Sequence, residues 1–437
     1  MNVRDSDAVA AMLIHAGYQQ AVTEDDADLI IVNSCSVRGK AEDKALGKLG
    51  LLCATKRERP DRKIGVMGCM AQRLGEKIFT KVPLLDFSVG TRRCAAIPKL
   101  VARVLNGEKN IFEISDVEAQ PDVPDSHNES GHCAFVTILL GCNRRCAYCI
   151  VPDVRGPELS RPAREILAEI TELASQGIRE VTLLGQSVMN YGLRNQVWEK
   201  DDPASTGGYH EPFTRLLEAV AAIPGICRIR FTSGHPSGCT DELVRAMSTL
   251  PQICHHLHLP FQAGSNRILK LMRRGYTREM YLDAINRLRT AMPDFSLTTD
   301  VIVGFPGESE SDFEETRSLM EVANFDNAFI FKYSPRPGTP AAEMDDDVTE
   351  AEKMRRNQVL LADQDIRGQR NNEALIDTVQ EVLVDGPSLR NTERWSGRTP
   401  GNKIAVFTPT ATLRPGTLAR IRIVRAAPQT LYGEILD

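Results

Sequence analysis

Three cysteines within a short segment are the most chemically informative feature of the sequence. Cys142, Cys146 and Cys149 have the spacing C-x3-C-x2-C and follow Gly141. Thiolates this close together can all bind one soft metal centre. A structural zinc site uses four protein ligands, whereas a [4Fe–4S] cluster held by three cysteines leaves one iron open. The spacing therefore favours an iron–sulfur cluster, and the alternative is a zinc loop completed by a distant Cys or His.

Two further cysteines follow short apolar runs near the N-terminus. Cys35 comes after residues 29–32 and Cys69 comes after residues 64–67, and a helical stretch over residues 41–56 separates the two runs. Strands that alternate with helices predict a small parallel sheet, and ligands of such sheets collect beyond the carboxyl ends of the strands. Cys35 and Cys69 are therefore placed to share a metal, and the alternative is a pair of buried structural thiols.

The first residues predict a helix without the strand that should precede it. Asp5, Ser6 and Asp7 can cap a helix whose apolar residues Val9 and Met12 follow a helical period. A parallel α/β unit normally opens with a strand. We therefore expect a translation start upstream of Met1 that would add this strand, and the alternative is a genuinely shortened protein.

The cysteine segment follows the first of six strand-like runs that alternate with amphipathic helical stretches. The runs are residues 134–140, 180–184, 228–232, 255–259, 297–303 and 328–333. The helical stretches include residues 164–176, 211–223, 240–250, 277–292 and 310–323. This repeated βα pattern predicts a partial (β/α)6 TIM-like barrel.

Polar or glycine-containing loops follow the predicted barrel strands. Active-site groups of such barrels lie on these loops. We therefore expect Gly185, Gln186, Gln262 and Gly304 to contact a cofactor, although either glycine alone can be explained as a turn residue.

Four histidines lie on or near the predicted barrel strands: His235, His255, His256 and His258. We interpret them as buried or pocket-lining residues rather than metal ligands. We expect His256 to lie on the face of its strand opposite to His255 and His258.

The last seventy residues predict a small β-barrel with a basic surface. Strand-like runs at residues 378–384, 403–407, 417–424 and 430–436 are separated by turns rich in Pro and Gly. Residues 387–430 contain eight Lys or Arg residues and one acid, Glu393. We expect Arg398, Lys403, Arg420 and Arg422 to contact phosphates, with a merely solvated basic face as the alternative.

Composition restricts the cellular setting. The chain has 437 residues, 11 cysteines and a formal net charge of −5. It shows no signal peptide and no apolar run long enough to cross a membrane. Many cysteines in such a chain predict a reducing cytoplasm, where clustered cysteines serve metals or catalysis.

These motifs together resemble the methylthiotransferase family of radical S-adenosylmethionine enzymes, in particular the branch that modifies tRNA. The segments that carry the resemblance are residues 33–38, 68–72, 141–152, 155–156, 160–162, 256–260 and 304–308. The resemblance implies an N-terminal methylthiotransferase domain over residues 1–107, a radical S-adenosylmethionine core over 128–366 and an RNA-binding TRAM barrel over 369–437.

The resemblance also implies the reaction and its cofactors. In this family the open iron binds S-adenosylmethionine, and the resulting 5′-deoxyadenosyl radical takes the hydrogen from C2 of adenine. By resemblance, Cys142, Cys146 and Cys149 hold this radical [4Fe–4S] cluster, while Cys35 and Cys69 hold a second, sulfur-bearing [4Fe–4S] cluster. A second S-adenosylmethionine supplies the methyl group. The implied partners of this monomeric cytoplasmic enzyme are tRNA and an electron donor such as flavodoxin or ferredoxin.

The motif Cys35-Ser-Val-Arg38 favours N6-(dimethylallyl)adenosine at position 37 of tRNA as the substrate. Threonylcarbamoyladenosine in tRNA and an aspartate of ribosomal protein S12 are the alternative substrates. The family's second cluster has three cysteines, and the first lies in a Gly-Cys-Gln-Met-Asn segment whose last two residues align with Met1 and Asn2. A tRNA-binding protein with impaired catalysis is therefore a further alternative.

Overall fold

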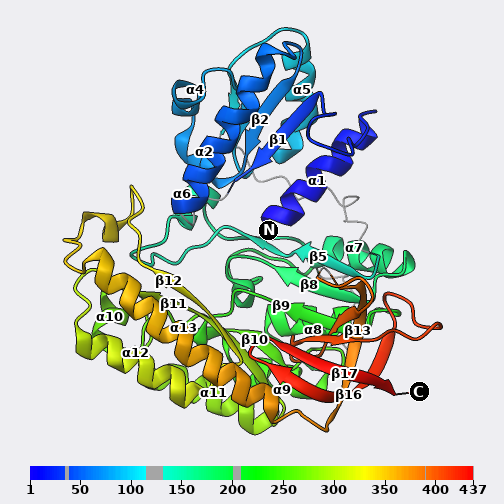
Figure 1. The fold of residues 1–437 in the computed structure, drawn as a ribbon, viewed down its shortest axis with the longest axis vertical. Coiled ribbons are helices and arrows are strands. Elements are labelled where there is room, and N and C mark those ends of the chain that lie inside the picture. The colour runs from blue at the N-terminus through cyan, green and yellow to red at the C-terminus, as the bar shows by residue number, and fades with distance from the viewer. Residues whose placement is uncertain (35–38, 115–130, 200–207, 389, 437) are drawn as a thin grey trace. The chain divides into compact units, whose positions relative to one another are not determined.

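The computed structural model describes residues 1–34, 39–114, 131–199, 208–388 and 390–436, apart from the side chains of residues 39–41 (Figure 1). The chain divides into two compact units. The first comprises residues 1–129, 140–161 and 336–339, and the second comprises residues 130–139, 162–335 and 340–437. The segment with the three cysteines therefore groups with the N-terminal part of the chain.

The first unit contains a four-stranded parallel sheet. Its strands are ordered β1 (Leu29–Asn33), β2 (Lys63–Met67), β3 (Phe87–Val89) and β4 (Ile111–Glu113). The main helices are α1 (Asn2–His15), α2 (Gly39–Ala54), α3 (Cys69–Leu74), α4 (Lys77–Lys81) and α5 (Ile97–Leu105). The sequence predicted the first two strands, whereas the other two are too short to show a strand period.

Helix α1 begins earlier than the sequence predicted. Its N-cap is Met1, so the prediction that Asp5, Ser6 and Asp7 cap the helix is wrong. Asp5 lies within the first turn, and its carboxylate pairs with the Arg155 guanidinium at 3.0 Å. A buried tertiary ion pair therefore uses the side chain that the sequence had suggested as a local cap.

The cysteine segment is short and well bounded. Strand β6 (Leu139–Leu140) precedes it, helix α6 (Val151–Arg155) follows the third cysteine, and strand β7 (Leu159–Ser160) comes next. Pro152 occupies the first turn of α6, where the missing amide hydrogen costs nothing.

The second unit contains the barrel that the sequence predicted. Its strands are β5 (Cys133–Thr137), β8 (Glu180–Leu184), β9 (Arg228–Phe231), β10 (His256–His258), β11 (Ser296–Val303) and β12 (Asn327–Lys332). Two parallel sheets, β5-β8-β9 and β10-β11-β12, are joined by a parallel bridge between Ile229 and Ile253. The intervening helices are α7 (Ala163–Ser175), α8 (Pro212–Ala221), α9 (Asp241–Thr249), α10 (Asn266–Leu271), α11 (Arg278–Ala291) and α12 (Glu310–Ala323).

Side-chain burial alternates along β11, so the two faces of this strand have different environments. Leu297, Val301 and Val303 are fully buried, whereas Thr298 and Asp300 remain partly exposed. The buried face of β11 packs into the core, and Thr298 and Asp300 lie on its opposite face.

The chain ends in a closed five-stranded barrel that follows helix α13 (Glu350–Glu373) (Figure 1). Its strands are β13 (Val379–Pro387), β14 (Trp395–Arg398), β15 (Ile404–Phe407), β16 (Leu418–Ala427) and β17 (Thr430–Leu436). Strand β14, with the sequence Trp-Ser-Gly-Arg, was missed because it has little apolar content. Within the described residues, no helix is both long and apolar enough to span a membrane.

Candidate active site

Backbone geometry shapes the loop that carries the three cysteines. Gly141 has a φ of +76°, and a Cβ atom there would lie 2.1 Å from the carbonyl oxygen of Pro157. The amide of Cys142 donates to the carbonyl of Gly156 at 3.0 Å, and that of Cys149 donates to the carbonyl of Cys146 at 3.1 Å. The close return of the chain therefore requires glycine and gathers the cysteines on one tight loop.

The thiols of this loop suit a soft metal centre. None of the three forms a disulfide, and Cys142 and Cys146 are 9% and 8% exposed. Burial raises the pKa of the Cys142 thiol, and the neighbouring Glu158 and Cys146 raise it further. A metal that binds and stabilises the thiolate would offset the free-energy cost of ionising the buried Cys142 thiol. Three soft donors on one loop fit an iron–sulfur cluster that keeps one iron open.

Residues after strand β3 hold the far end of the cysteine segment. The Thr91 hydroxyl donates to the carbonyl of Val154 at 2.6 Å. The Arg92 guanidinium donates to the carbonyls of Arg155 and Pro157, each at 2.8 Å. Two side chains from the turn after β3 thus satisfy the last carbonyls of α6 and fix its position.

Cys69 lies at the end of β2 and opens helix α3. The preceding Gly68 has a φ of +98°, and a Cβ atom there would lie 2.6 Å from Oδ1 of Asn33. Cys69 is 2% exposed and packs against Ile150 and Val154, the residues that follow the third cysteine of the loop. The structure therefore brings this predicted ligand against the cysteine segment. Cys35 follows Asn33 by two residues in the sequence, but it lies outside the described residues.

The predicted cofactor contacts lie at the carboxyl ends of barrel strands. Gly185 follows β8, and the position of its missing Cβ is 3.0 Å from the carbonyl oxygen of Leu139. Gln186 follows directly and is partly exposed. Gln262 is 6% exposed with a φ of +69°, and its backbone pairs with Asp300 and Ile302 of β11.

Ser233 is a second non-glycine residue with a positive φ at this end of the barrel, after Gln262, and it was not predicted from the sequence. Ser233, two residues beyond β9, has a φ of +60°. Non-glycine residues in this region cost free energy and gather at functional sites. The Ser-Gly-His sequence after the strand was the available signal for this strained turn.

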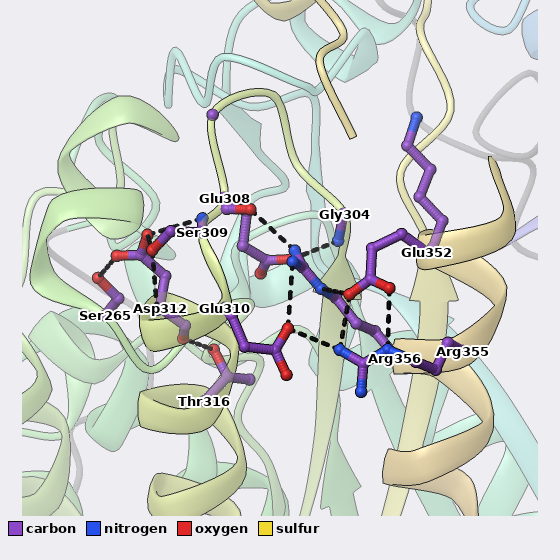
Figure 2. Close-up of polar contacts among 12 residues, drawn as sticks. Ser265, Gly304, Glu308, Ser309, Glu310, Asp312, Thr316, Glu352, Arg355 and Arg356 are labelled. Carbon is purple, nitrogen blue, oxygen red and sulfur yellow. Dashed lines mark hydrogen bonds and ion pairs between the residues drawn. The ribbon is translucent and has the colours of Figure 1, made fainter. Parts of the chain in front are cut away.

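Gly304 belongs to a polar network that joins the loop after β11 to helix α13. Its amide donates to the Glu308 carboxylate at 2.5 Å, and Arg356 donates to the same carboxylate at 2.8 Å. A Cβ atom at Gly304 would lie 2.3 Å from Cγ of Lys353. Figure 2 shows Glu352 and Glu310 on either side of the two arginines of α13. The need for glycine at position 304 is therefore explained by packing, whatever its role toward a cofactor.

His256 and His258 do not lie on opposite faces of their strand as the sequence predicted, although His235 and His256 are buried. His256 and His258 both bond the hydroxyl of Thr298, at 3.1 Å and 3.0 Å. They therefore share one face, and the expectation that His256 faces away from His258 is wrong because residues two apart on a strand point the same way. Burial lowers the pKa of His256 well below its usual value, with Arg230 and His258 adding to this shift.

The four predicted RNA contacts have different environments in the C-terminal barrel. Arg420 and Arg422 are exposed on β16, whereas Ile421 between them is fully buried. Lys403 instead donates to the carboxylate of Asp326 at 2.5 Å. Arg398 is partly buried and donates to Oδ1 of Asn402 at 3.1 Å. The exposed arginines of β16 are therefore the more accessible pair.

Three family models match the chain in succession. The uncharacterized protein family UPF0004 matches residues 1–90, the radical SAM superfamily matches residues 136–320 and the TRAM domain matches residues 374–436. Among solved structures, the radical S-adenosylmethionine methyltransferase TsrM from Kitasatospora setae aligns with a TM-score of 0.57. It is 14% identical, and the alignment covers 77% of this chain and 73% of TsrM, which supports the fold alone.

The fold and the cysteine loop define a radical S-adenosylmethionine enzyme, a class that uses a [4Fe–4S] cluster and S-adenosylmethionine. Curated relatives narrow the assignment. The tRNA-2-methylthio-N(6)-dimethylallyladenosine synthase of Opitutus terrae is 45% identical, with 100% of this chain and 95% of that protein covered. The synthase of Akkermansia muciniphila is 46% identical, with 99% and 96% covered. The chain belongs to this family of tRNA methylthiotransferases.

Proposed function

We propose that this enzyme converts the C2–H bond of N6-(dimethylallyl)adenosine at position 37 of tRNA into C2–S–CH3. The observation that carries the proposal is the packing of Cys69 against Ile150 and Val154, just beyond the three cysteines. A sulfur-bearing group on Cys69 would lie close to the cluster that generates the radical. The full-length similarity to dimethylallyladenosine methylthiotransferases supports the same substrate.

Each cysteine set has a proposed role. Cys142, Cys146 and Cys149 would hold the radical cluster, which, with S-adenosylmethionine bound, supplies the radical chemistry. Cys35 and Cys69 would contribute to an auxiliary [4Fe–4S] cluster. Burial of Cys69 at 2% exposure would keep water from its sulfur. Gly185, Gln186, Gln262 and Gly304, at the carboxyl ends of the barrel strands, would contact S-adenosylmethionine.

The remaining parts of the chain would bind and orient the RNA. The three proposed domains are residues 1–107, 128–366 and 369–437. In the last of these, Arg398, Lys403, Arg420 and Arg422 would contact phosphates. We further propose a monomer that takes electrons from a flavodoxin or ferredoxin. The described cysteines form no disulfide, which supports a reducing cytoplasm as its compartment.

The test is expression of the full chain in cells that lack their own tRNA methylthiotransferase, followed by mass analysis of the tRNA nucleosides. We expect 2-methylthio-N6-(dimethylallyl)adenosine with the parent chain and none with the Cys142→Ala variant. Methylthiolated threonylcarbamoyladenosine, or a mass shift of ribosomal protein S12, would show that the enzyme acts on that substrate instead of the proposed one. Unmodified tRNA and S12, despite a fully loaded protein, would support an RNA-binding role without catalysis.

A further inference from the structure

Three side chains that can bind a metal lie together in the second compact unit. They are His132, Cys133 and Asp385, and one donor atom of each lies within 4.8 Å of the other two. Cys133 is the first residue of β5, His132 directly precedes it, and Asp385 lies in β13 of the C-terminal barrel. The cluster therefore joins two parts of the chain that are separated by 253 positions of sequence.

Backbone contacts hold His132 and Cys133 in place. The carbonyl of His132 accepts hydrogen bonds from the amides of Arg179 and Glu180, at 2.8 Å and 3.0 Å. Cys133 lies in register with Glu180 of β8. Gly416, in the turn before β16, packs directly against His132, because a Cβ atom there would lie 2.9 Å from the Cβ atom of the histidine. Two of the three donors are therefore carried by a fixed backbone.

A β-bulge carries the third donor. The register of β13 against β14 shifts between Val384 and Gly386, so that Asp385 is the extra residue of the bulge. Bulges change the direction in which a side chain points and are common next to functional sites. The side chain of Asp385 is 38% exposed and that of His132 is 9% exposed. The cluster is thus closed on the histidine side and open to water on the aspartate side.

The distances favour a metal site over a simple ion pair. Nε2 of His132 lies 3.4 Å from Oδ1 of Asp385. A charged N–H···O bond is about 2.7–2.9 Å long, whereas nitrogen and oxygen ligands of one tetrahedral zinc ion lie about 3.4 Å apart. The sulfur of Cys133 lies within 4.8 Å of both atoms, against about 3.6 Å in such a site. A small rotation of the Cys133 side chain therefore completes the set.

The charges around the cluster are compatible with a divalent cation. A thiolate and a carboxylate together neutralise an ion of charge +2. The two arginines of β9 are already paired with other acids: Arg228 with Glu381 at 3.0 Å, and Arg230 with Glu180 at 2.9 Å. Their positive charges are therefore balanced without Asp385.

We propose that His132, Cys133 and Asp385 bind one Zn²⁺ ion. One sulfur, one nitrogen and one oxygen donor suit this borderline metal, whereas three thiolates suit an iron–sulfur cluster. Water fills the fourth position, so the ion is exchangeable, and it ties the start of β5 to the C-terminal barrel. The site uses none of the cysteines assigned to iron–sulfur clusters, and the inference does not depend on the proposed function.

The experiment uses the anaerobically reconstituted full chain, to which one equivalent of Zn²⁺ is added. Loosely bound metal is removed by gel filtration, zinc and iron are counted, and X-ray absorption at the zinc edge identifies the donors without interference from iron. We expect about one zinc per chain, bound by one sulfur and three nitrogen or oxygen donors. Zinc held mainly by sulfur would show that it occupies the cluster cysteines, and that result would overturn the proposal.

Asp385→Asn separates a metal ligand from a hydrogen-bond partner. The amide oxygen of Asn still accepts a hydrogen bond from His132, but it is neutral and a much poorer zinc ligand. Because this side chain is partly exposed, we expect the variant to fold and to keep its iron while it loses most of its zinc. Zinc retained at the parental level in Asp385→Asn would contradict the proposal.

Two cysteine variants form a matched pair. Cys133→Ser should lose the zinc, whereas Cys227→Ser should keep it, since the Cys227 thiol instead donates to the carbonyl of Arg179 at 3.3 Å. Equal zinc contents in these two variants would overturn the site. If Cys133→Ser does not fold, Asp385→Asn decides.

The effect of zinc on stability provides an independent measurement. A metal that binds only the folded state raises the temperature of unfolding. We expect added Zn²⁺ to raise this temperature for the parent and for Cys227→Ser, and to leave that of Asp385→Asn unchanged. An equal rise in the parent and in Asp385→Asn would place the stabilising ion elsewhere and would overturn the proposal.

Discussion

At the scale of single residues, the basic side chains of the C-terminal barrel separate into structural and accessible groups. Lys403 is tied to Asp326, and the two side chains are 17% and 15% exposed. Arg420 and Arg422 lie on the exposed face of β16. On the neighbouring strands β13 and β17, Arg420 lies opposite Glu381 and Leu436, and Arg422 lies opposite Val379 and Glu434.

We expect the double variant Arg420→Ala/Arg422→Ala to bind tRNA more weakly. The slope of its binding constant against salt concentration, on logarithmic axes, should fall by about two, because two phosphate contacts are lost. Its stability should change by less than about 0.5 kcal/mol, because both side chains are exposed. The measurement is tRNA affinity at several salt concentrations. Lys403→Ala removes a side chain that is held by Asp326, so it should also lose about 1–3 kcal/mol of stability, which the double variant should not. An unchanged salt slope in the double variant would argue against phosphate contacts on this face.

Two cysteines outside the predicted cluster sites, Cys239 and Cys254, are buried in the fold. Burial raises the pKa of Cys239 to about 12, and Arg287 lowers it only in part. Cys254 is similarly raised to about 11. The reactive thiolate forms of both are therefore scarce at neutral pH.

We expect Cys239 and Cys254 to resist alkylation of the folded protein at pH 8 and to react fully once the chain is unfolded. The raised pKa values also predict stability that is complete below pH 9 and lost as the pH rises toward 12. Mass spectrometry of alkylated peptides checks the first expectation, and denaturant midpoints from pH 8 to 11 check the second. Rapid labelling of Cys239 in the folded protein would contradict its burial.

At the scale of elements, helix α12 begins with an unusually dense set of contacts. Ser309 and Asp312 form a capping box, and Ser265 donates to the Asp312 carboxylate at 2.5 Å (Figure 2). Arg267 pairs with the same carboxylate. Burial alone would raise the pKa of Asp312, but the hydrogen bonds from Arg267, Ser265 and Ser309 outweigh it and lower the pKa well below 3.8.

We expect Asp312→Asn to lower the free energy of unfolding by about 1–3 kcal/mol at pH 7, because charged hydrogen bonds at a helix start are lost. A depressed pKa in the folded state gives stability that is present above the unfolded value and lost as pH falls through the folded value. The difference between parent and variant should therefore shrink in acid. Glu310→Gln is the control, since its side chain is 56% exposed. A difference that stays undiminished from pH 7 to pH 2 would contradict the ionic explanation.

At the scale of the whole molecule, the C-terminal barrel sits against polar side chains of the larger barrel in the same compact unit. Arg230 of β9 donates to the carbonyls of Thr399 and Pro400 at 2.8 Å and 2.9 Å. It also pairs with Glu180 of β8 at 2.9 Å, and these two side chains are 7% and 6% exposed. Arg228 donates to the carbonyl of Arg398 at 2.5 Å.

We expect Arg230→Met to destabilise the protein by about 3–5 kcal/mol, because Glu180 is left as an unpaired buried charge. The double variant Arg230→Met/Glu180→Met should recover part of this loss, since no isolated charge then remains. Chemical denaturation of the four members of this cycle measures the coupling. Additive effects of the two substitutions would mean that Arg230 acts through the carbonyls of Thr399 and Pro400 rather than through Glu180.

Much of this architecture could be predicted from local patterns. The spacing of Cys142, Cys146 and Cys149 and the six βα units were readable because soft-metal loops and barrel strands have short-range signatures. The exposure of Arg420 and Arg422 followed from strand alternation. Strands β3 and β4 were missed because each has only three residues, and β14 was missed because it has little apolar content.

Contacts between residues far apart in the chain were decided by the tertiary structure alone. Arg155 meets Asp5 across 150 positions of sequence, and Arg230 meets Pro400 across 170. The ion pair of Lys403 with Asp326 is of the same kind. A local pattern shows that a side chain is charged, but its partner depends on which surfaces the fold buries, because burial makes an unpaired charge costly.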